Sequence, residues 1–152
     1  MTNSPRYSVL GLVVSPLEVA GLLALAFVCA IAFWRGGPSE RRVAGVILLA
    51  WLGSLILDDD NTTGIQWAIF AIDVLLAIWL AAEVLFGPRI WLYFALAAQV
   101  MIVMTHIAFM IQSEIVQDAF YSAYYFWSYV VLGSLAIGSL FKPVGLRTKR
   151  RV

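Results

Sequence analysis

The chain contains five long apolar runs, each separated from the next by a short charged or turn-forming segment. They cover residues 17–34, 43–57, 65–86, 90–111 and 119–141. An apolar run of about 17 to 25 residues is long enough to cross a bilayer as a helix. Of the 152 residues, 62% are hydrophobic and only 12% are charged, which is outside the range of soluble domains. We therefore expect an all-α fold, an integral membrane bundle of five transmembrane helices that forms a single domain over residues 1–152.

The second run is the shortest, and the distribution of positive charge supports it as a span. With five spans and the N-terminus outside, nine of the ten Lys and Arg residues face the inside and only Arg6 lies outside. Without the second span, the best division is seven against three. Because inner loops of membrane proteins are rich in Lys and Arg, the sequence predicts the N-terminus outside and the C-terminus inside.

The segment before and within the first run admits other interpretations. The small residues at 30–32 resemble a signal-peptide cleavage site, but cleavage there leaves three loop arginines outside, against the charge rule. Ser15, followed by Pro16 and by Glu18, has the pattern of a capping box and predicts the start of the first helix. We expect residues 9–14 to extend this helix along the membrane interface.

Two ionisable residues lie inside the predicted spans, where the bilayer makes them costly. They are Asp73 in the third span and His106 in the fourth. Gln66 and Gln99 each lie seven residues before one of them, and so share a helix face with it. On the fifth span, a third stripe with polar tips consists of Tyr121, Tyr124, Tyr125 and Ser128. All three stripes reach a similar depth in the outer half of the bilayer. We therefore expect Asp73 and His106 to lie within hydrogen-bond distance of each other, with Tyr124 or Tyr125 beside them.

These stripes support two hypotheses. The functional one is a polar cavity or ligand-binding site that opens outward beneath an acidic loop and serves a proton, a cation or a small ligand. Its residues are Asp73, His106, Gln66, Gln99, Tyr124, Tyr125 and Ser128, and the outer acidic loop is Asp58, Asp59 and Asp60. Histidine changes charge near neutral pH, so an Asp–His couple also fits a protonatable switch. The alternative is that the same side chains only hydrogen-bond across helices and fix their packing.

Several function classes find no support in the residues. A single histidine and a single cysteine, Cys29, cannot supply a zinc site or a bis-histidine haem, so we expect no metal and no cofactor. Phosphate-binding loops, nucleophile elbows and paired catalytic carboxylates are missing from the sequence, so we expect no enzyme. A net charge of +1 does not indicate a nucleic-acid partner.

Three pairs of small residues and the charged inner side suggest contacts with other molecules. Pairs spaced for close helix packing are Ala20 with Ala24, Ala50 with Ser54, and Ser134 with Gly138. They can pack the bundle itself, or they can meet a second copy or a larger complex. The basic tail, with Lys142, Arg147, Lys149, Arg150 and Arg151, is expected to bind anionic lipid at the cytoplasmic face. We expect Glu83 to form an interfacial ion pair with Arg89 or with this tail.

The chain resembles, in general character only, the small multi-pass proteins of bacterial inner membranes. The sequence therefore predicts a non-enzymatic accessory or structural subunit of that membrane that acts by helix–helix association. Two alternatives stay open. One is a small transporter or channel-like protein with the Asp/His cavity, and the other is a phage-type holin.

Overall fold

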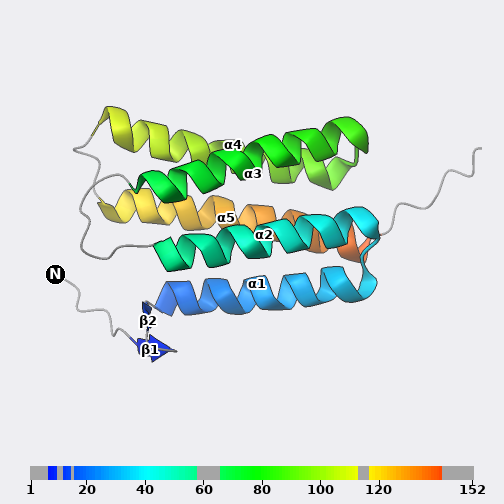
Figure 1. Ribbon diagram of the computed structural model, residues 1–152, viewed down its shortest axis with the longest axis horizontal. Coiled ribbons are helices and arrows are strands. Elements are labelled where there is room, and N and C mark those ends of the chain that lie inside the picture. Colours follow the sequence, from blue (N-terminus) through cyan, green and yellow to red (C-terminus); the bar gives the residue numbers. More distant parts are fainter. Residues whose placement is uncertain (1–6, 10–11, 15, 58–65, 113–116, 142–152) are drawn as a thin grey trace, which may run out of the picture.

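Five helices lie side by side along one axis in the computed structural model, which describes residues 7–9, 12–14, 16–57, 66–112 and 117–141 (Figure 1). The helices are α1 (Pro16–Arg35), α2 (Pro38–Leu57), α3 (Trp67–Phe86), α4 (Ile90–Ile111) and α5 (Gln117–Leu140). The short turns between α1 and α2 and between α3 and α4 lie at the same end of the bundle, which we call the arginine end because Arg35, Arg41, Arg42 and Arg89 gather there.

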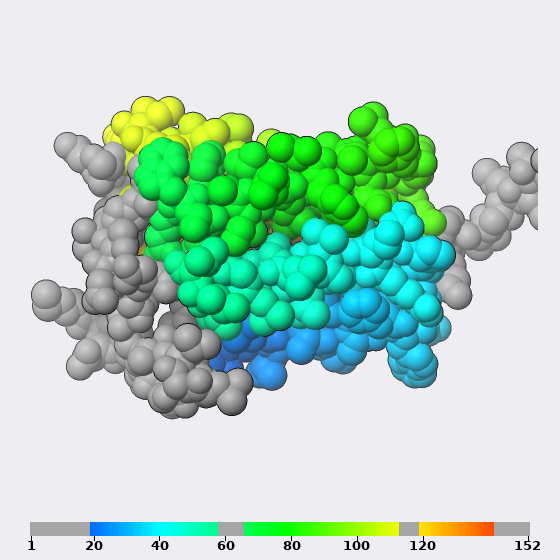
Figure 2. Space-filling view, viewed as in Figure 1, coloured from blue at the N-terminus to red at the C-terminus, as the bar shows by residue number. Residues whose placement is uncertain are grey.

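The helices form a closed ring in chain order. Each packs against the next, and α5 completes the ring by packing against both α4 and α1. On one face of the molecule the side chains of α1, α2 and α3 meet along their length (Figure 2). The core inside the ring is aliphatic, and its largest fully buried side chains include Leu25, Ile47, Leu80, Leu92, Leu132 and Leu135.

The outer surface carries many large apolar side chains. Phe27, Leu49, Leu75 and Phe94 come from four different helices and are 68%, 71%, 65% and 62% exposed. Water does not favour so many exposed large apolar side chains, whereas lipid does. Within the described residues, α3, α4 and the segment Ala119–Leu140 are each long and apolar enough to cross a membrane, and Val19–Arg35 is a shorter apolar stretch.

The second helix begins earlier than hydropathy indicated. We expected it to start at Val43, but α2 starts at Pro38. Proline suits the first position of a helix because its missing N–H has no partner there in any case. The charged residues that follow it, including Glu40 and Arg42, lowered the hydropathy of this turn and hid it from an apolar-run analysis.

The expected helical extension before α1 is wrong. The structure has two short antiparallel strands there, β1 (Tyr7–Val9) and β2 (Leu12–Val14), in which Tyr7 pairs with Val14. Valine favours extended backbone, and Pro16 disfavours helical geometry in the residue before it. The proposed capping contact of Ser15 with Glu18 falls outside the described residues and side chains.

Candidate functional site

The buried carboxylate of Asp73 joins α3 to α4. Its Oδ2 lies 3.1 Å from Nε2 of His106, and its Oδ1 accepts a hydrogen bond of 2.9 Å from Nε2 of Gln99. The same Gln99 nitrogen also lies 3.2 Å from the backbone oxygen of Asp73. The contact between Asp73 and His106 expected from their depth and cost is therefore present, and Gln99 supplies the second partner of the carboxylate.

Helix periodicity explains why these three side chains meet. Gln99 and His106 are seven residues apart on α4, which places them two turns apart on one face. That face packs against α3, where Asp73 lies level with both. The turn Gly87-Pro88-Arg89 makes α3 and α4 antiparallel neighbours, so the register between them is fixed by a short connection.

Aromatic rings surround the imidazole of His106. The ring centroids of Phe70, Phe120 and Tyr124 lie 5.6, 5.3 and 5.6 Å from it, with interplanar angles of 60°, 70° and 82°. Because these rings come from α3 and α5, the histidine is held from two sides besides its own helix. Together, the three polar residues and the three rings form what we call the Asp73 cluster.

The Asp73 cluster is closed to solvent. The side chains of Asp73 and His106 are 8% and 6% exposed, and Gln99 is 1% exposed. A hydrogen bond between Oδ2 and Nε2 requires one proton between the two atoms, whichever of them carries it. The arrangement can therefore hold a proton inside the bundle and tie two helices together, and it holds the partners that a buried carboxylate needs.

The structure separates the remaining predicted residues by their contacts. Tyr124 is the tyrosine next to His106, whereas Tyr125 contacts the ring of Tyr124 at 6.0 Å. The hydroxyl of Ser128 donates to the backbone oxygen of Tyr124 in its own helix at 2.8 Å. Gln66 is the N-cap residue of α3, more than a turn before the cluster. The ring of Tyr124 thus lies beside His106, as expected for one of the two tyrosines.

Two groups of predicted residues lie outside the described residues. They are the acidic loop of Asp58, Asp59 and Asp60 and the basic tail with Lys142, Arg147, Lys149, Arg150 and Arg151.

Two ion pairs connect the helices at the arginine end. Glu83 of α3 accepts two hydrogen bonds of 2.9 Å from Arg42 of α2, and Oγ of Ser39 lies 3.3 Å from it. Arg89, in the turn before α4, pairs with Glu40 of α2. We expected Glu83 to pair with Arg89 or the tail. Among the described residues, Arg42 of α2 is its ion-pair partner and Glu40 of α2 pairs with Arg89, while the tail lies outside the described residues. The first turn of α2, which the apolar-run analysis missed, carries these residues.

Comparison of the chain with protein families, with curated proteins and with solved structures gave no match. The class of protein is consequently defined by the fold and the Asp73 cluster. Three helices apolar enough for a bilayer, an apolar outer surface and polar groups directed inward indicate a helical membrane protein.

Proposed function

We propose that the protein is a non-enzymatic accessory or structural subunit of a bacterial inner membrane, which acts by associating through its helices with a second copy or with a larger complex. All five helices cross the bilayer in this proposal, with the N-terminus outside. The position of the arginine end supports this orientation, because the turns after α1 and α3 both lie there and both carry arginines.

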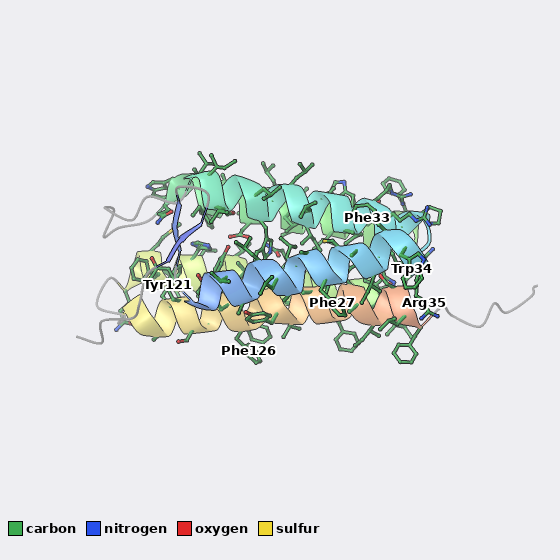
Figure 3. The ribbon with its side chains drawn as sticks, turned by 90° about the horizontal axis from the view of Figure 1, so that it is seen from below. Phe27, Phe33, Trp34, Arg35, Tyr121 and Phe126 are labelled. Carbon is green, nitrogen blue, oxygen red and sulfur yellow. The ribbon has the colours of Figure 1, made fainter. Side chains whose placement is uncertain are left out.

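The observation that carries the proposal is a pair of small residues on the outer face of α1. Ala26 and Ala30 are one turn apart, and both are exposed. Phe27 and Trp34, on the same helix (Figure 3), are 68% and 82% exposed. Small residues at this spacing let another helix approach closely.

Members of the small-residue pairs identified from the sequence pack inside the bundle. Gly138 lies against the indole of Trp91, so the pair of Ser134 with Gly138 packs α5 on α4. Ala24 and Ala50 pack on the core of the bundle. Ala26 and Ala30 are both exposed on α1, so this pair supports association with an external helix more directly than Ala24, Ala50 and Gly138 do.

The closed Asp73 cluster supports a role without transport. A pathway for ions or solutes needs polar groups that face it, whereas Asp73 has both oxygens bonded to α4 and is almost fully buried. Its hydrogen bonds stabilise one arrangement of α3 and α4.

The association is tested by cysteine crosslinking in native membranes. Cys29 is buried and is first replaced by alanine, after which Ala30→Cys places a single thiol on the outer face of α1. Ala97→Cys, exposed on α4, is the matched control. We expect oxidation to give a crosslinked product of defined mass from Ala30→Cys and none from Ala97→Cys. A protein that stays monomeric at both positions, and also in mild detergent, contradicts the proposal.

A second candidate, a small transporter or channel-like protein, is favoured by one observation. An ionisable pair inside membrane helices often marks a proton or ion pathway, and Asp73 with His106 is such a pair. Flux into liposomes distinguishes the two functions: transport that Asp73→Asn abolishes supports this candidate, and background flux in both proteins removes it.

A further inference from the structure

A hollow opens at the arginine end, between the first turn of α2 and the turn that joins α3 to α4. Its lining includes Ser39, Arg42, Glu83, Phe86 and Arg89. These residues come from segments more than 40 positions apart in the chain, and the two ion pairs described above hold them together. The hollow is therefore a fixed feature of the fold.

In the described part of the chain, the two arginines of the hollow keep hydrogen-bond donors that their ion pairs do not use. The carboxylate of Glu83 already accepts two bonds from Arg42 and one from Ser39. A guanidinium has five N–H donors. Within the described part of the chain, Arg42 directs two of its donors to Glu83 and Arg89 directs one to Glu40. Since the side chains of Arg42 and Arg89 are 57% and 36% exposed, a ligand with acceptor oxygens can reach the others.

Large apolar side chains border the hollow. Phe86 lines it and is 91% exposed, and Leu85 and Ile90 beside it are 81% and 79% exposed. These three residues end α3 and begin α4, where a spanning helix reaches the boundary between acyl chains and headgroups. Arginine donors and exposed apolar groups are thus adjacent at the depth where a lipid presents both phosphate and hydrocarbon.

We propose that this hollow binds one anionic phospholipid, with the phosphate on Arg42 and Arg89 and an acyl chain along Phe86. Guanidinium groups match phosphate oxygens in geometry and charge and bind them by charge-assisted hydrogen bonds. Arg41, which is exposed at the same end, adds positive charge that favours an anionic headgroup over a zwitterionic one. The proposal rests on neither the basic tail nor an association through α1.

The test compares lipid binding by full-length variants in an uncharged detergent, measured by native mass spectrometry with phosphatidylglycerol, phosphatidylcholine and inorganic phosphate as probes. The main variant, Arg42→Gln with Glu83→Gln, removes a guanidinium together with its partner, so it strands no carboxylate and keeps the net charge. Arg35→Gln is the control, because it removes one charge from the same end outside the hollow lining. We expect phosphatidylglycerol affinity to fall at least about tenfold in the double variant, as for lost charge-assisted hydrogen bonds, and to stay near wild type in the control.

Phe86→Ala keeps the proposal testable should the double variant fold poorly, since this side chain is almost fully exposed. We expect it to weaken phosphatidylglycerol binding and to leave the response to inorganic phosphate unchanged. Equal affinity in wild type and the double variant overturns the site, and so does an equal loss in Arg35→Gln. A site that binds phosphate but responds to neither the lipid nor Phe86→Ala is an oxyanion site, which overturns the assignment to a lipid.

Discussion

Replacing His106 with leucine should strongly destabilise the bundle. The substitution removes the group that faces Oδ2 of Asp73 and leaves a carboxylate that is 8% exposed with Gln99 as its side-chain partner. Hydrogen bonds between membrane helices contribute about 0.6 kcal/mol on average, whereas leaving a buried polar group without its hydrogen-bond partner costs about 1 to 3 kcal/mol. Because the remaining oxygen stays buried inside the ring of helices, the upper end of that range applies and we expect a loss of about 3 kcal/mol.

The double variant, Asp73→Leu with His106→Leu, separates the cost of a stranded carboxylate from the value of the contact. Removing both groups leaves apolar side chains in an apolar setting, so the double variant should be more stable than the sum of the single losses predicts, by about 1 to 3 kcal/mol. Thr105→Ala, next to His106, is the control. Within the described residues, its hydroxyl donates to the backbone oxygen of Met101 in its own helix, so we expect a small effect.

The assay is equilibrium unfolding in mixed micelles of mild detergent and dodecyl sulfate, with the thermal midpoint as a second measure. For a chain of this size, 1 kcal/mol corresponds to a shift of about 2 to 4 °C, so His106→Leu should lower the midpoint by about 6 to 12 °C. A loss below about 1 kcal/mol, or strict additivity in the double variant, would refute the claim that these groups stabilise each other.

Three further predictions concern packing, charge and topology. Gly138→Ala places a Cβ 2.5 Å from the buried ring of Trp91 and should cost about 1 to 3 kcal/mol in the same assay, whereas Gly133→Ala, whose Cβ meets nothing within 4 Å, should be neutral or stabilising. Arg89→Gln leaves the buried Glu40 without the guanidinium that pairs with it and should lower the free energy of unfolding by about 3 kcal/mol. Arg89→Lys should recover part of that stability. An unchanged thermal midpoint in Arg89→Gln contradicts a stabilising role of the ion pair between Arg89 and Glu40. Green fluorescent protein fused to the C-terminus should fluoresce and alkaline phosphatase fused there should be inactive, and the reverse pattern contradicts the orientation.

Much of the helical framework is predictable from local sequence, because hydropathy and turn residues act over short ranges. The apolar runs identified all five helices, and α4 has the expected bounds of Ile90–Ile111. The start of α2 and the strands before α1 were missed for opposite reasons. Charged residues can occupy the first turn of a helix whose remaining turns are apolar. A short valine-rich segment before a proline can form a strand.

The need of Asp73 and His106 for partners follows from the sequence, because burial in a bilayer makes an unpaired polar group too costly and helical spacing predicts one depth for both. Their further partners depend on the tertiary structure. Gln99 bonds to the carboxylate because the α3–α4 register brings it level with Asp73, and the ring of Tyr124 contacts His106 because α5 packs against α4. The pairs of Arg42 with Glu83 and Arg89 with Glu40 likewise depend on which helices are neighbours, and no local pattern of residues encodes that.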